Sequence, residues 1–120
     1  MTQANINVSV RNIDKKISVL DIQGEINAFA ESELMNAYNE AVSNGSQNII
    51  LNFTGLDYMN SSGIGLLVTM LIRVQRQKQQ LLAYGLSDHY LQIFELTRLN
   101  EAITIYLTEE AAIDAAQVTA

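Results

Sequence analysis

The feature that most constrains the fold is a short apolar run at residues 49–53, of sequence IILNF, bounded by Gly45 and Gly55. Such a run is typical of a central strand that is buried on both faces. Amphipathic helical patterns lie on either side of it, at residues 31–44 and from residue 60 to about 78. A buried strand between two such helices predicts parallel crossovers, with the helices packed against a sheet.

The chain begins with a predicted β-hairpin. Residues 6–10 alternate apolar and polar side chains, and residues 17–22 form a second β-pattern after a turn at residues 14–16. We expect Gly24 to end this second strand. Residues 54–59 are predicted to form a loop between the central strand and the following helix.

The second half of the chain repeats the alternation of strand and helix. Strands are predicted at residues 81–84 and 103–106. Ser87 or Asp88 is expected to cap the helix after the first of these strands. Thr108 is expected to cap the C-terminal helix, whose acidic first turn suits the helix dipole.

The predicted fold class is therefore α/β, with a mixed β-sheet, an N-terminal hairpin and helices packed against the sheet in the order β-β-α-β-α-β-α-β-α. The chain has 120 residues, of which 48% are hydrophobic, and it contains no proline. It has no low-complexity linker and no internal repeat. We expect one domain over residues 1–120, with its core at about residues 5–116.

The composition excludes several kinds of active site. The chain has no cysteine, which excludes disulfides, thiolate metal sites and a cysteine nucleophile. Its one histidine, His89, has no second ligand for a transition metal and is expected on the surface or at a helix cap. A hydrolytic serine would need His89 as its base, and the sequence has no nucleophile elbow, dinucleotide fingerprint or phosphate loop. We therefore expect no enzyme, no metal and no cofactor.

The charge balance points to protein partners. Thirteen acidic and seven basic residues give a net charge of −6, which disfavours nucleic acid and anionic membranes. The first residues show no signal-peptide pattern, and the longest apolar-rich stretch, residues 64–72, is far shorter than a membrane span of about 20 residues. We expect a cytoplasmic protein.

The segment Asn60-Ser61-Ser62-Gly63 carries the most chemical information. It brings two adjacent hydroxyls to the first turn of a predicted helix, where unpaired amides favour an anion. A phosphate on Ser61 would add roughly −1.5 to −2 charges without unfolding the domain. Asn and Ser before a helix are most often plain N-caps, so the segment alone leaves both interpretations open.

Three stretches together resemble one family. The stretch Asn60-Ser61-Ser62-Gly63-Ile64-Gly65, preceded by Leu56-Asp57-Tyr58-Met59, is similar to the Asp-Ser-Ser/Thr-Gly-Leu-Gly signature of anti-sigma-factor antagonists of the STAS family. Gly24-Glu25-Ile26-Asn27 resembles the family's Gly-Glu-Leu/Ile-Asp. Residues 94–99, of sequence FELTRL, resemble its Phe-x-hydrophobic-x-Gly-Leu segment. The resemblance covers about residues 5–116.

The resemblance implies a bacterial partner switch that regulates transcription through signal transduction. Ser61 would be the phosphoacceptor, and Ser62 a helix cap and contact residue. The unphosphorylated protein would bind a GHKL-type serine kinase that doubles as an anti-sigma factor, and phosphorylation would release it. A phosphatase of the PP2C type would reset the switch. The alternative is a STAS module that is not phosphorylated and serves as a scaffold or binds a small ligand, such as a nucleotide, in the same loop region.

The expected partner surface combines this loop with an apolar rim on the following helix. Leu66 and Met70 are predicted to lie partly off the core face and to form that rim. The core face is predicted to consist of Ile64, Leu67, Val68 and Leu71, together with Ile72 or Val74. The predicted partner-binding residues are Glu25, Asn27, Asn60, Ser61, Ser62, Gly63, Leu66 and Met70.

The chain departs from the family pattern at three places. Asn27 and Asn60 stand where the family usually has Asp, so each removes a negative charge near the expected partner surface. This change would weaken complementarity with a kinase that expects Asp and indicates a different cognate partner. Thr97-Arg98 replaces the family's Ser/Thr-Gly, which puts the local turn geometry in question.

Overall fold

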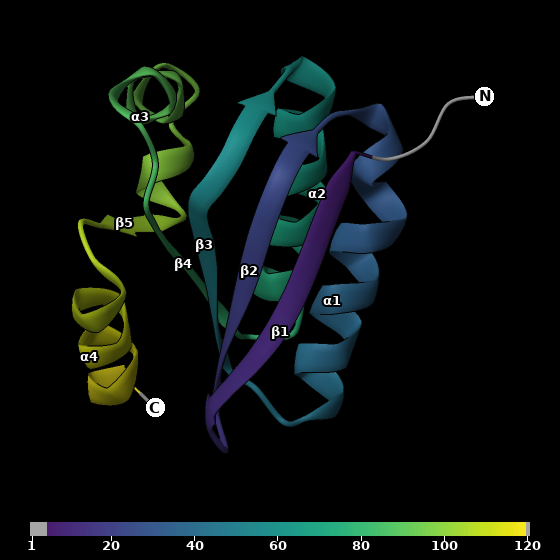
Figure 1. The fold of residues 1–120 in the computed structure, drawn as a ribbon. Coiled ribbons are helices and arrows are strands. Elements are labelled where there is room, and N and C mark those ends of the chain that lie inside the picture. The colour runs from purple at the N-terminus through teal and green to yellow at the C-terminus, as the bar shows by residue number, and fades with distance from the viewer. Residues whose placement is uncertain (1–4, 120) are drawn as a thin grey trace.

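The predicted hairpin and crossovers build one five-stranded sheet in the computed structural model, which describes residues 5–119 (Figure 1). The strands are β1 (Ile6–Asp14), β2 (Ile17–Ile26), β3 (Asn48–Met59), β4 (Gln80–Tyr84) and β5 (Thr104–Tyr106). The helices are α1 (Glu31–Ser43), α2 (Ser61–Arg76), α3 (Asp88–Leu96) and α4 (Glu109–Thr119), with short 3₁₀ helices η1 (Ala28–Ala30) and η2 (Leu99–Glu101).

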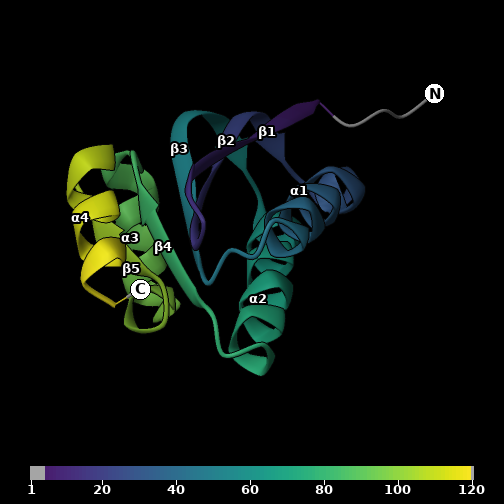
Figure 2. The same cartoon turned by 90° about the horizontal axis from the view of Figure 1, so that it is seen from below.

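The strand order is β1-β2-β3-β4-β5. The β1–β2 pair is antiparallel and the other three pairs are parallel, which confirms the predicted mixed sheet and element order. The carboxyl ends of β2 and β3 lie together, since Ile26 pairs with Met59, whereas β4 ends beside Asn52 in the first half of β3. Figure 2 shows α1 and α2 on one face of the sheet and α4 on the other.

The central strand β3 is buried on both faces, as predicted. Ile49, Leu51 and Phe53 belong to the core under α1, α2 and α3, whereas Ile50 belongs to a second core under α4. Alternate residues of a strand point to opposite faces, so one apolar run supplies both cores. The second core joins these residues: Ile17, Val19, Ile50, Leu82, Tyr84, Ala112 and Ala116.

The structure contradicts two predicted boundaries. Gly24 does not end β2, and residues 54–59 are not a loop but the second half of β3. Gly24 has φ +103°, and a Cβ there would lie 2.1 Å from the carbonyl oxygen of Asn5. Glycine therefore lets β2 continue to Ile26 beside a closely packed neighbour. The extra residues of β2 then pair with the second half of β3, across two register shifts.

An ion-pair cluster ties α4 to the sheet. The Arg11 guanidinium donates to Asp21 and forms a second ion pair with Glu109 at 2.8 Å. Asn52 donates a further hydrogen bond to Asp21 at 2.7 Å. The hydrogen bond from Arg11 holds the pKa of the Asp21 carboxyl below its usual value, against the opposing effect of burial. Burial also raises the pKa of Tyr84, in the core beneath α4, to about 12.

The two ends of the described chain lie far apart. β1 begins at the edge where β2 and β3 end, since Ile6 pairs with Gly24, whereas α4 ends toward the opposite edge (Figure 1). Along residues 5–119, every helix is too short or too polar to cross a membrane.

Replacing Asp21 by Asn should lower the free energy of unfolding at pH 7 by about 1 kcal/mol or less, because the ion pair is partly exposed. The folded-state pKa of Asp21 is lowered, so its contribution is full above the unfolded value of about 3.9 and is lost as pH falls through the folded value. Urea unfolding from pH 7 to pH 3 measures the effect.

The matched control is Asp114→Asn, the same change at an exposed position of α4. Equal acid sensitivity of Asp21→Asn and the unmodified chain would contradict this role for Asp21.

Candidate functional site

Ser61 opens α2 at the sheet edge where β2 and β3 end (Figure 1). The two strands end side by side because Ile26 pairs with Met59, and the backbone N–H of Asn60 donates to the Ile26 carbonyl at 3.3 Å. Ser61 and Ser62 are both exposed. The Ser61 side chain is therefore accessible to a second protein.

Asn60 is the N-cap of α2. Its backbone is extended, at φ −102° and ψ −175°, and its side-chain oxygen accepts the N–H of Gly63 at 3.0 Å. The prediction that Ser62 caps the helix is therefore wrong, since Asn60 already fills that role. Within residues 5–119, no acceptor is found for the amides of Ser61 and Ser62. Amides in the first turn of a helix have no intrahelical acceptor, so these two donors are available to an external one.

Gly63 sets how closely α2 approaches the sheet. It is buried, and a Cβ at this position would lie 2.0 Å from the carbonyl oxygen of Ile26. Only a residue without a side chain fits there. Gly63 was predicted to contact a partner, but its burial against Ile26 makes it a packing residue that positions Ser61.

Gly63→Ala should destabilise the protein by roughly 1–3 kcal/mol, because the added methyl group must push α2 away from β2. The matched control is Gly65→Ala in the same helix, where a Cβ would meet nothing within 4 Å. Alanine there should stabilise the protein by about 0.5–1 kcal/mol, since glycine is a poor helix former. Urea unfolding of both variants measures the difference, and equal effects would refute the close contact.

Tyr90 of α3 fixes the last residue of β3. Its hydroxyl accepts the backbone N–H of Met59 at 2.8 Å in a buried position. This bond satisfies an amide two residues before Ser61 that would otherwise be buried without a partner. The sequence pattern gives Tyr90 no such role, because a bond between residues 31 positions apart leaves no local signal.

Tyr90→Phe should cost roughly 1–3 kcal/mol in unfolding free energy, because the Met59 amide loses its acceptor. Tyr58→Phe, which removes a hydroxyl from a side chain that is 51% exposed, is the control and should change stability little. Hydrogen exchange should show the Met59 amide exchanging faster in Tyr90→Phe alone. Unchanged protection of that amide would argue against the bond.

The outer face of α2 differs from the prediction. Met70 is fully buried and Leu66 is half-buried, so the expected rim of Leu66 and Met70 is wrong at Met70. Val68 and Ile72 are 37% and 44% exposed, although Val68 was predicted to face the core. The buried positions of α2 are Gly63, Leu67, Met70, Leu71 and Val74.

The reason for this difference is the helical phase that Gly63 imposes. With Gly63 against the sheet, residues at three- and four-residue spacings from it turn inward, and Met70 is one of them. The sequence carried this signal, because the series from Gly63 to Val74 has helical spacing throughout. The exposed residues that follow Ser61 at helical spacing on one side of α2 are then Gly65, Val68 and Ile72.

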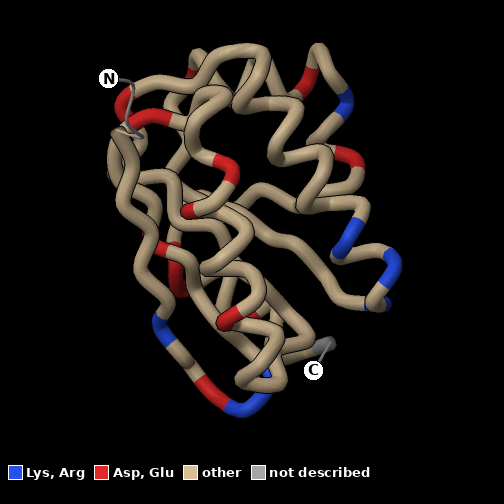
Figure 3. Tube along the Cα trace, turned by 90° about the vertical axis from the view of Figure 1, so that its right-hand side faces the viewer, with Lys and Arg blue, Asp and Glu red and all other residues tan. Residues whose placement is uncertain are grey.

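Charge is distributed unevenly between the two ends of the molecule. Glu25 and Asp57 lie on the strand ends beside Ser61, and Asp88 begins α3 at the same edge. Basic residues lie in the β1–β2 turn and at the end of α2, toward the other end, and a further one, Arg98, follows α3; Figure 3 shows basic segments in both parts of the molecule. The end that carries Ser61 therefore suits a basic partner surface.

The model of the STAS domain family matches residues 8–112 of this chain. The chain belongs to the STAS domain family. The match spans the sheet, α1, α2 and α3 and reaches into α4, so this STAS domain contains every element that positions Ser61.

Comparison with known proteins agrees with this family. The chain is 28% identical over 101 residues to the anti-sigma-B factor antagonist of Staphylococcus aureus (strain NCTC 8325 / PS 47), covering 84% of this chain and 93% of that protein.

Two solved structures of SpoIIAA share the fold. The unphosphorylated anti-sigma factor antagonist SpoIIAA matches with a TM-score of 0.72 and 22% identity, covering 92% of this chain and 97% of that one. The phosphorylated form of SpoIIAA, a Bacillus cell fate determinant, matches with a TM-score of 0.70 and 24% identity, covering 90% and 97%.

The two asparagines that replace the expected Asp both act as caps in this STAS domain. Asn27 accepts the N–H of Phe29 at 2.9 Å at the start of η1, and Asn60 caps α2. An amide oxygen performs this task as a carboxylate would, without the charge. The half-buried Glu25 lies two residues before Asn27, so a negative charge remains at this edge.

Arg98 keeps the turn that a glycine would provide. It adopts the left-handed conformation, at φ 61° and ψ 19°, between α3 and η2. The replacement of glycine therefore leaves the turn geometry in place, at the steric cost of a Cβ in this region.

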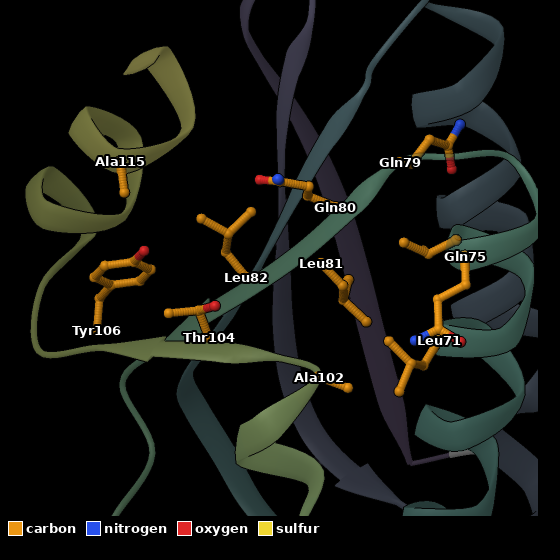
Figure 4. A pocket seen from close by; sticks show the side chains of 11 residues that line it. Leu71, Gln75, Gln79, Gln80, Leu81, Leu82, Ala102, Thr104, Tyr106 and Ala115 are labelled. Atoms are coloured by element: carbon orange, nitrogen blue, oxygen red, sulfur yellow. The ribbon is translucent and has the colours of Figure 1, made fainter. Parts of the chain in front are cut away.

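A hollow of about 390 Å³ lies between α2, β4, β5 and α4 (Figure 4). It adjoins Leu71 and Gln75 in the second half of α2, away from Ser61, and none of its lining residues is charged. A nucleotide phosphate would find no cation there. Within residues 5–119, no His, Asp or Glu residues gather in a group that could hold a metal ion.

Proposed function

We propose that this STAS domain is an anti-sigma factor antagonist whose binding is switched by phosphorylation of Ser61. The observation that carries the proposal is an exposed serine at the first position of α2, within the family's serine motif. The relative named anti-sigma-B factor antagonist supports the same function. In this proposal the domain spans residues 1–120 and acts in the bacterial cytoplasm.

The start of α2 can accept a phosphate without rearrangement of the core. The side chain of Ser61 is exposed, and within residues 5–119 the amides of Ser61 and Ser62 have no acceptor, so they can donate to phosphate oxygens. The helix dipole favours the added charge by about 0.3–1 kcal/mol. The contacts of Gly63 and Asn60 that anchor the helix do not involve the Ser61 hydroxyl. The modified protein keeps its fold and changes its surface.

The residues around Ser61 explain why phosphorylation would release the partner. Gly65, Val68 and Ile72 form an uncharged exposed surface on the same helix. A partner that covers this surface when Ser61 is unmodified would have to strip water from a doubly charged phosphate after modification. A tenfold to hundredfold loss of affinity requires only about 1.4–2.8 kcal/mol.

The partner in this proposal is a GHKL-type serine kinase that is also the anti-sigma factor. It transfers the γ-phosphoryl group of ATP to the Ser61 oxygen, its own base takes the hydroxyl proton, and ADP leaves. A phosphatase of the PP2C type hydrolyses the phosphate ester and restores the hydroxyl. The antagonist supplies the acceptor and no catalytic group, so it is not an enzyme.

Ser61→Asp should fold like the unmodified chain and bind its cognate kinase tenfold to hundredfold more weakly, because the carboxylate places a charge in the contact surface. Ser61→Ala should bind persistently and take up no phosphate. Ser62→Asp adds the same charge one residue further and should weaken binding less. Calorimetric titration with ADP present measures kinase binding, and mass spectrometry after incubation with ATP measures phosphate uptake.

Two results would count against the proposal. Binding of Ser61→Asp equal to that of the unmodified chain would remove the electrostatic basis of the switch. Absence of phosphate on Ser61 with every neighbouring kinase, together with tight binding of a small ligand, would favour an unphosphorylated binding module.

A further inference from the structure

The outward face of α2 carries a continuous uncharged line. Ser61, Gly65, Val68 and Ile72 are all exposed and follow one another at spacings of four, three and four residues, which places them on one side of the helix. Residues 61–72 contain no Asp, Glu, Lys or Arg. An exposed helix face normally carries charged side chains, so this surface is suited to burial against another molecule.

The missing side chain of Gly65 serves no packing contact within residues 5–119, although its carbonyl accepts a hydrogen bond from Thr69 at 3.1 Å. A Cβ at this position would meet nothing within 4 Å, and the residue lies inside a helix, where glycine is less favourable than alanine. Gly63, two residues earlier, has a clear packing role against β2. What Gly65 provides is a flat place on the outer surface, where another backbone can approach closely.

We propose that a helix of the anti-sigma factor packs antiparallel to α2 along this line and comes closest at Gly65. The inference rests on the function proposed above and specifies the partner element. The four-three-four spacing is the seam along which two helices interlock. The partner helix would present a small residue opposite Gly65 and apolar residues opposite Val68 and Ile72.

Charge decides the orientation of the partner helix. The line begins at Ser61, beside the acidic residues Glu25, Asp57 and Asp88, and basic side chains favour the last turn of a helix, so the C-terminal end of the partner helix suits this edge. At the other end, Arg73 and Arg76 lie in the last turn of α2 and form no ion pair with any residue in the range 5–119. Acidic residues favour the first turn of a helix, so an antiparallel partner brings them to these arginines.

Gly65→Leu tests the close approach. The variant should fold, because the added side chain enters open space, and should bind the anti-sigma factor at least tenfold more weakly than the unmodified chain. The matched control is Gln117→Leu, which adds a leucine at an exposed position of α4 on the opposite face of the sheet and should bind normally. Circular dichroism melting and calorimetric titration measure folding and binding.

Single cysteines test the helix and its direction, since the chain has no cysteine of its own. Val68→Cys and Ile72→Cys, each carrying a thiol-linked photocrosslinker, should attach to one helix of the anti-sigma factor. The attachment from position 72 should lie nearer the N-terminus of that helix than the attachment from position 68.

Each outcome bears on a distinct claim. If the unmodified chain binds and Gly65→Leu binds equally well, the close approach is wrong and the proposed function survives. Crosslinks in a loop, crosslinks in the reverse order, or crosslinked homodimers would also overturn the partner helix. Failure of the unmodified chain to bind any neighbouring kinase would remove the proposed function and this inference together.

Discussion

The position of Ser61 depends on the contact between Gly63 and the carbonyl oxygen of Ile26. This contact brings the first turn of α2 directly onto the end of β2, with Asn60 bonded to the same carbonyl. It sets the rotation of the helix, and the rotation decides which side chains are buried and which face solvent. A small backbone feature at the edge of the sheet thereby defines the whole exposed face of a sixteen-residue helix.

Much of the fold follows from the sequence because apolar periodicity reports burial directly. The run at residues 49–53 predicted a strand buried on both faces, and the structure has Ile49, Ile50 and Leu51 fully buried. Residues 54–59 were misjudged because their Thr, Gly and Asp favour a loop, whereas their strand conformation comes from pairing with β2. Pairing of this kind depends on distant residues and has no local pattern.

The candidate site was only partly predictable for the same reason. The motif located Ser61 and Asn60, and both lie where a helix begins. The assignment of Met70 to the surface failed because an apolar helix has several plausible core faces, and only the contact at Gly63 selects one. The hydroxyl of Tyr90 could not be assigned from the sequence. Its bond to Met59 joins two segments that are distant in the chain, and hydrophobic periodicity reports only local structure.

The placement of the chain's two ends relative to Ser61 has a practical consequence. The described chain starts beside the edge that carries the serine and finishes on α4, across the sheet from α2. An additional module, a fluorescent label or a surface tether joined after α4 would leave the serine approachable, whereas the same addition before β1 would crowd it. Attachment after α4 therefore keeps the exposed start of α2 free for contact with another molecule.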